Sequence, residues 1–122
     1  MARILIIDDS LTELASFSRM LENRGFETVS VNNAEEGLVK AREVMPDLIL
    51  MDVVMPGMNG FQATRRLTKD PQTAAIPVVM ITAKDQETDR IWGLRQGARD
   101  YVVKPVDESI LMDKIMALLQ NQ

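Results

Sequence analysis

Extended and helical patterns alternate five times along this chain. Each extended segment has the length of a β-strand. The expected strands cover residues 4–7, 27–31, 48–51, 78–81 and 100–103, and the expected helices cover 10–23, 33–44, 61–68, 86–96 and a segment that opens at Asp107. Such alternation is typical of an α/β fold built on a parallel sheet.

The strand at 27–31 differs from the others because it alternates polar and apolar residues. One of its faces therefore meets water, which suits an edge strand, whereas 4–7, 48–51 and 78–81 are apolar almost throughout and are covered on both faces. The order 2-1-3-4-5, a common order of doubly wound sheets, satisfies both conditions with right-handed crossovers. We therefore expect a doubly wound five-stranded parallel sheet flanked by five helices.

Polar capping residues mark where several helices begin. Ser10 and Glu13 form a capping-box pattern, in which each side chain bonds to the backbone of the other residue. Asn33 is the expected cap of the second helix, and Gly25 fits a left-handed stop after the first.

Four of the five strands end in a polar residue. Asp8 and Asp9 follow the first strand, Asp52 follows the third, and Thr82 and Lys104 follow the fourth and fifth. Each residue alone has a structural explanation, as a helix start, a turn, a cap or a solvated lysine. Because the carboxyl ends of parallel strands converge on one crevice, their shared placement favours a single site instead.

A cluster of three carboxylates needs cations nearby. Two carboxylates about 5 Å apart repel by roughly 3 kcal/mol at an effective dielectric constant near 20. Lys104 supplies one positive charge, and a divalent cation would supply the rest. With a few oxygen ligands and neither cysteine nor histidine in the chain, Mg²⁺ fits better than Zn²⁺ or Ca²⁺.

Length, charge and hydropathy limit the binding partners and the cellular location that we expect. A length of 122 residues fits one domain. The net charge is −4 and Arg65-Arg66 is only a pair of basic residues, so a nucleic acid is not an expected partner. No apolar run approaches the roughly 18 residues of a membrane helix, and no signal peptide is evident, so we expect a cytoplasmic protein without membrane insertion.

The combined motif resembles the receiver domains of two-component response regulators, the CheY-like family. The matching segments are Asp8-Asp9, Asp52, 55–60, Thr82-Ala83 and Lys104-Pro105. Segments 57–65 and 96–101 also resemble the PilH-type regulators of type IV pilus twitching systems. The resemblance implies one receiver domain over residues 1–122, with no output domain.

The resemblance also implies a phosphoryl-transfer site. Asp52 would be the phosphoacceptor, and its donor would be a phosphohistidine on a histidine kinase or phosphotransfer domain. Asp9 and Asp52 would bind Mg²⁺ directly, Asp8 would act through water, and the backbone carbonyl of Val54 would be a further ligand. Lys104 would neutralise the phosphoryl oxygens. The chain would not be an enzyme acting on an external substrate, but would catalyse its own phosphotransfer and dephosphorylation.

By the same resemblance, Thr82 and Tyr101 would form a switch. Thr82 would bond the phosphoryl group and leave room for Tyr101 to turn inward, changing the face formed by the fourth helix, the fifth strand and the fifth helix. A downstream protein would bind there. Met112 and Met116 on the last helix are either docking residues or simply buried, and the bond before Pro105 is expected to be cis.

Three functions follow from these residues. The first is a stand-alone response regulator that signals through protein contacts, in twitching motility or chemotaxis-like control. The second is a phosphate sink for a shared kinase. The third is a Mg²⁺-dependent phosphatase of the haloacid-dehalogenase type, but these enzymes carry Asp-x-Asp and Val54 stands at the second acidic position. Val54 and Lys84 flank the path of a hydrolytic water by analogy, and are expected to influence the phosphoryl lifetime.

Overall fold

Strands and helices alternate along all of residues 2–120, which are the residues that the computed structural model describes. The strands are β1 (Arg3–Ile7), β2 (Glu27–Val31), β3 (Leu48–Met51), β4 (Val78–Thr82) and β5 (Asp100–Val103). The helices are α1 (Leu11–Glu22), α2 (Ala34–Val44), α3 (Gly60–Lys69), α4 (Glu87–Arg95) and α5 (Glu108–Gln120). The expected elements are therefore confirmed, with boundaries that shift by one or two residues.

The strands form one parallel sheet in the order β2-β1-β3-β4-β5, as predicted. β2 lies at one edge and keeps an exposed polar side, which explains its alternating sequence. β1 and β3 are central neighbours, and Ile7 pairs with Met51 at their carboxyl ends. The residues that follow these two strands therefore start from the same end of the sheet.

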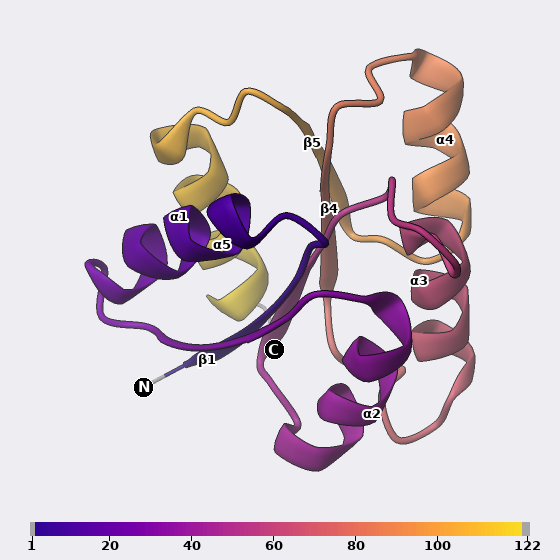
Figure 1. The fold of residues 1–122 in the computed structure, drawn as a ribbon, viewed down its shortest axis with the longest axis horizontal. Helices are drawn as coiled ribbons and strands as arrows, with labels where there is room; N and C mark the ends of the chain where they lie inside the picture. The colour runs from indigo at the N-terminus through magenta and orange to yellow at the C-terminus, as the bar shows by residue number, and fades with distance from the viewer. Residues whose placement is uncertain (1, 121–122) are drawn as a thin grey trace.

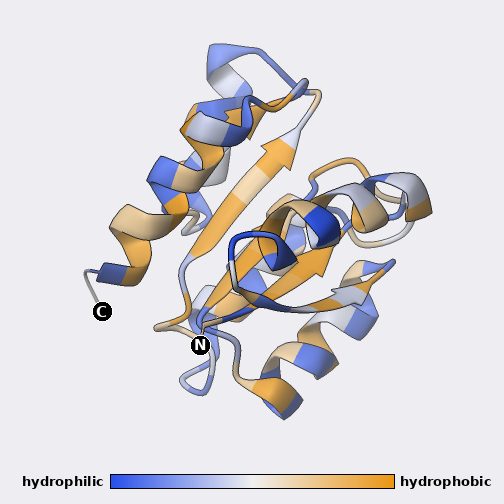
Figure 2. Ribbon diagram, turned by 90° about the vertical axis from the view of Figure 1, so that its left-hand side faces the viewer, coloured by the Kyte–Doolittle hydropathy of each residue, from blue (hydrophilic) through white to orange (hydrophobic). Residues whose placement is uncertain are grey.

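Helices cover both faces of the sheet (Figure 1). α1 and α5 lie on one face, and α2, α3 and α4 lie on the other. The first face buries a cluster that includes Ile4, Ile6, Leu50, Val79, Leu14, Phe17, Leu111 and Ile115, and the second buries Leu5, Ile7, Ile49, Met51, Ala41, Ala63 and Leu67. Successive strand residues thus alternate between two cores. Figure 2 shows the result, with apolar strands between helices whose outer surfaces are polar. None of the described helices has the length and apolar character needed to cross a membrane.

Polar side chains cap the start of at least four helices, but one predicted cap is only half formed. The Asn33 side chain accepts a hydrogen bond from the Glu36 N–H at 2.8 Å, as expected. The Ser10 hydroxyl accepts one from the Glu13 N–H at 3.3 Å, but the Glu13 carboxylate does not return to Ser10. The reciprocal box is instead formed at the start of α3, between Asn59 and Gln62.

Gly60 sets α3 tightly against the end of β3. Its N–H donates to the Val53 carbonyl at 2.9 Å. A Cβ placed on Gly60 would lie 2.1 Å from the Asp52 carbonyl oxygen, a backbone atom that cannot rotate away. The first turn of α3 therefore fixes the backbone that carries Asp52.

Candidate functional site

The carboxyl end of the sheet brings the predicted acidic residues together. Asp8 follows β1 and Asp52 follows β3, and the Asp52 N–H donates to the Ile7 carbonyl at 2.9 Å. One carboxylate oxygen from each of Asp8, Asp9 and Asp52 lies within 4.8 Å of the others. Residues far apart in sequence are therefore close enough to bind one ion.

Burial differs among the three carboxylates. Asp8 is 2% exposed and Asp52 is 7% exposed, whereas Asp9 faces solvent. Burial raises the pKa of Asp8 to about 6, and the nearby Asp52 adds to this, although hydrogen bonds from the Ser10 N–H and Lys104 act in the opposite direction. Burial likewise raises the pKa of Asp52, against the attraction of Lys104. The binding of a proton or another cation therefore stabilises the cluster.

Lys104 reaches this cluster from the end of β5. Its Nζ lies 3.3 Å from Asp8 Oδ2 and 3.7 Å from Asp52 Oδ1, and it also forms an ion pair with Glu13. Burial acts to lower the pKa of Lys104, but the three carboxylates outweigh it and raise the pKa. The lysine is therefore held as a cation between the acidic cluster and α1.

Glu13 is the site residue that the sequence analysis missed. Burial acts to raise the pKa of its carboxyl, but the hydrogen bond from Lys104 prevails and lowers it. The capping-box pattern assigned this side chain to Ser10, whereas in the structure it pairs with Lys104. A carboxylate in the first turn of a helix that starts at the crevice was the available signal, since such a turn lies beside the strand ends.

Thr82 and Tyr101 are connected through the backbone of Lys84. The Thr82 side chain is fully buried, and its hydroxyl accepts a hydrogen bond from the Lys84 N–H at 3.2 Å. The Tyr101 hydroxyl donates to the Lys84 carbonyl at 2.9 Å. Tyr101 is only 6% exposed, so its ring already points inward in this structure. Burial, followed by the charge of Asp89, raises the pKa of Tyr101 to about 12, which keeps the hydroxyl protonated as a donor.

The remaining predicted positions lie around the same crevice. Val54 follows Asp52 by two residues and is 59% exposed, beside a small pocket that Lys84 and Phe61 also line. The Lys84 ammonium lies 3.7 Å from an Asp89 carboxylate oxygen, so it is drawn toward α4. The Lys104–Pro105 bond is cis, as the resemblance implied.

The two methionines expected on one stripe of α5 have different environments. Met112 is 4% exposed and belongs to the core beneath α1, so it is not a docking residue. Met116 is 42% exposed, and Trp92 on α4 is 51% exposed. Only Met116 and Trp92 of this set are available to a partner.

The comparisons with known proteins agree with this geometry. The family model described as the response regulator receiver domain matches residues 4–116. The chain is 58% identical to protein PilH of Pseudomonas aeruginosa, with 98% of each chain covered. It is 41% identical to response regulator PleD of Caulobacter vibrioides over 96% of this chain, although it spans only 26% of that protein.

Solved structures show the same fold. The crystal structure of chemotaxis protein CheY4 of Vibrio cholerae has a TM-score of 0.90 and 29% identity, covering 97% of this chain and 98% of that one. The fold, the strand-end cluster and the family match all lead to one conclusion: the chain belongs to the response regulator receiver domain family.

Proposed function

We propose that Asp52 accepts a phosphoryl group and that this modification switches the protein between two signalling states. The observation that carries this proposal is the convergence of Asp8, Asp9 and Asp52 within 4.8 Å, with the Lys104 ammonium 3.7 Å from Asp52. The donor is a phosphohistidine of a histidine kinase or phosphotransfer domain, because the chain has no histidine of its own.

The chemistry is a direct transfer between two nucleophiles. A carboxylate oxygen of Asp52 forms a bond to phosphorus while the bond from phosphorus to the donor nitrogen breaks, which gives an acyl phosphate. Lys104 is placed to offset negative charge on the phosphoryl oxygens as they approach Asp52. In dephosphorylation, the oxygen of a water molecule forms a bond to phosphorus while the bond from phosphorus to Asp52 breaks, which releases inorganic phosphate and restores the carboxylate. The chain would thus catalyse its own phosphorylation and dephosphorylation.

The residues present fit a Mg²⁺ ion. All three donor side chains offer oxygen, and the exposed Asp9 leaves one side open to the water molecules that Mg²⁺ retains. Asp9 and Asp52 would hold the ion directly, Asp8 through water, and the Val54 carbonyl would be a further ligand by family resemblance. When bound, Mg²⁺ supplies the positive charge that three carboxylates and a phosphoryl group together require.

The switch is proposed to run from Thr82 to Tyr101. The Thr82 hydroxyl accepts from the Lys84 N–H and can donate its own hydrogen to a phosphoryl oxygen on Asp52. Tyr101 holds the carbonyl of the same Lys84 residue. A movement of Thr82 would therefore pull on the group that anchors Tyr101, and change the face formed by α4, β5 and α5, where a downstream protein binds.

The similarity to PilH supports a role in type IV pilus twitching motility. This role is tested by expressing the chain in a P. aeruginosa strain that lacks PilH. We expect the wild-type chain to restore twitching and Asp52→Asn to fail. Restoration by both chains would contradict a role that depends on phosphorylation.

The phosphoacceptor is tested with acetyl phosphate and Mg²⁺, followed by intact mass spectrometry. We expect one phosphoryl group on the wild-type chain and none on Asp52→Asn. Asp85→Asn is the control, because Asp85 is an exposed residue after β4 outside the acidic cluster. Labelling of Asp52→Asn, or labelling of the wild-type chain that persists in EDTA, would overturn the assignment of residue or metal.

A further inference from the structure

Basic residues gather on the outer side of α3, away from the acidic crevice. Arg65, Arg66 and Lys69 are exposed there, and with Arg42 from α2 they line a groove of about 810 Å³. Among the described residues that line the groove, Asp70 is the only one with a carboxylate. The groove therefore has an excess of positive charge in a chain whose net charge is −4.

Most of this charge has no partner within the described part of the chain. Arg42 is neutralised by Asp70, since its guanidinium lies 2.7 Å from Asp70 Oδ2. Arg65 reaches only the neutral side-chain oxygen of Gln96, at 3.5 Å. Arg66 and Lys69 have no hydrogen bond or ion pair to any side chain of residues 2–120. Three cationic groups thus remain for an external anion.

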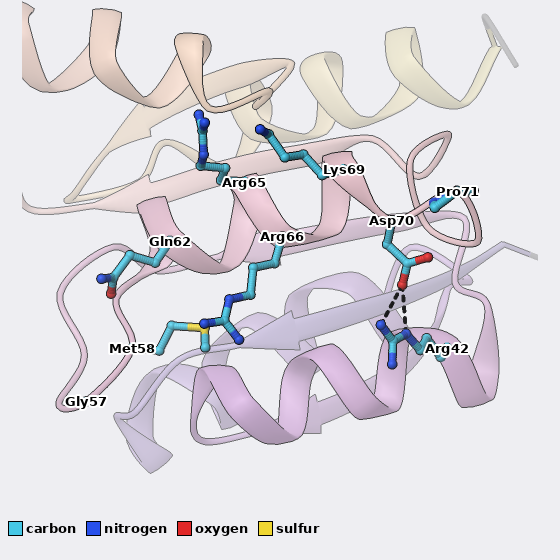
Figure 3. A pocket seen from close by; sticks show the side chains of 9 residues that line it. All are labelled: Arg42, Gly57, Met58, Gln62, Arg65, Arg66, Lys69, Asp70 and Pro71. Carbon is cyan, nitrogen blue, oxygen red and sulfur yellow. Dashed lines mark hydrogen bonds and ion pairs between the residues drawn. The ribbon is translucent and has the colours of Figure 1, made fainter.

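The arrangement of Arg65, Arg66 and Lys69 favours an extended ligand. In Figure 3, Arg65 and Lys69 extend to one side of α3, whereas Arg66 extends toward α2 and Arg42. A ligand with several negative charges matches these two sets better than a single small anion does. The groove also has an apolar residue near each end of α3, Met58 before the helix and Pro71 after it.

We propose that the α2–α3 groove binds a short acidic segment of a partner protein, with apolar residues at the ends of that segment. A ten-residue helix is roughly 15 Å long, which an extended chain covers with about five residues. A long polyanion such as a nucleic acid fits less well, because beyond the groove it would meet the acidic remainder of the surface. Glu35, which lines the adjoining pocket with Arg66, marks where the basic surface stops.

This surface is separate from the phosphorylation site. Its cationic side chains lie outside the set that contacts Asp52, and none belongs to the face of α4, β5 and α5. The groove and the switch can therefore be tested independently. Arg66→Glu/Lys69→Glu should still be labelled by acetyl phosphate at the wild-type rate.

The test uses a short synthetic peptide with four acidic residues between two leucines, and a matched peptide with four glutamines. Binding is followed by isothermal titration calorimetry and by amide shifts of the isotopically labelled full chain. We expect the acidic peptide alone to bind, with shifts on α3 and about tenfold weaker binding to Arg66→Glu/Lys69→Glu. The control Arg19→Glu/Arg95→Glu changes net charge equally, at exposed arginines on α1 and α4, and should bind like wild type.

Several results would overturn the proposal. They are absence of binding to the wild-type chain, equal binding of both peptides, and equal loss in the two double variants. A single-stranded oligonucleotide that binds the groove more tightly than the acidic peptide would also overturn it, because the ligand would then be a nucleic acid.

Discussion

Asp8 is the most unfavourably placed charge of the acidic cluster. Its carboxylate is almost fully buried, and burial raises its pKa to about 6. An aspartate in the unfolded chain titrates near pH ~4, so the folded chain holds this proton more tightly. The contribution of Asp8 to the free energy of unfolding is therefore fully present below about pH 4, and it is lost as the pH rises toward and through 6.

Asp8→Asn removes the cost of burying a charged carboxylate at this position. Without metal, we expect the variant to gain about 1 to 3 kcal/mol in the free energy of unfolding at pH 8, and about 1 kcal/mol less than that at pH 5. Urea unfolding in EDTA at both pH values measures the difference. Asp113→Asn on α5 serves as the control, since Asp113 is exposed. An equal gain at the two pH values would contradict the burial argument.

Glu13 competes with Asp52 for the Lys104 ammonium. Glu13→Gln weakens this competition without removing a hydrogen-bonding group, so Lys104 becomes more available to an incoming phosphoryl group. We expect the rate of phosphorylation by acetyl phosphate to rise several-fold, which corresponds to about 1 kcal/mol of barrier. A mass-spectrometric time course measures the rate, with exposed Glu36→Gln as the control. A rate that is unchanged or slower would show that Glu13 does not restrain the lysine.

The sequence predicted the acidic cluster and its lysine because those residues directly follow strands. Strand order alone brings Asp8 and Asp52 together, and no side-chain detail is needed. Glu13 was missed because a glutamate in the first turn of α1 suits both a capping box with Ser10 and an ion pair with Lys104. The choice between them depends on where Lys104 lies, and the fold supplies that position.

At the scale of the elements, the close contact between the start of α3 and the end of β3 can be tested at Gly60. Gly60→Ala would drive a methyl group into the Asp52 carbonyl, whereas Gly25→Ala meets no atom within 4 Å and is strained only by its φ of +90°. We expect Gly60→Ala to cost about 2 to 4 kcal/mol and Gly25→Ala about 1 kcal/mol. Urea unfolding measures both, and phosphorylation should slow only in Gly60→Ala. Equal losses in the free energy of unfolding would show that α3 shifts to make room for the methyl group at little cost.

In α5, the spacing of apolar residues predicts only part of the surface that is buried. Leu111 and Ile115 are buried as their spacing predicted, and Leu118 is partly buried. Met112 is also buried, because α5 packs beside α1 as well as against the sheet. Apolar spacing indicates the centre of a buried stripe, but the number of neighbouring elements determines its width.

At the scale of the whole molecule, the single tryptophan can report the switch. Trp92 is half exposed, and the adjacent Gly93 packs so closely that an added Cβ would lie 3.1 Å from the Tyr101 ring. A change at Tyr101 should therefore reach α4. We expect acetyl phosphate with Mg²⁺ to shift Trp92 emission in the wild-type chain but not in Asp52→Asn. Full labelling without any spectral change would contradict coupling between the crevice and α4.

The ion pair between Lys104 and Asp8 spans 96 positions of the chain. A ribosome synthesises the carboxylates of the crevice early and this lysine late. A nascent chain therefore exposes mutually repelling acids before it possesses its own counterion for them. Its folding should therefore depend on the emergence of β5 and of Lys104, which follows that strand.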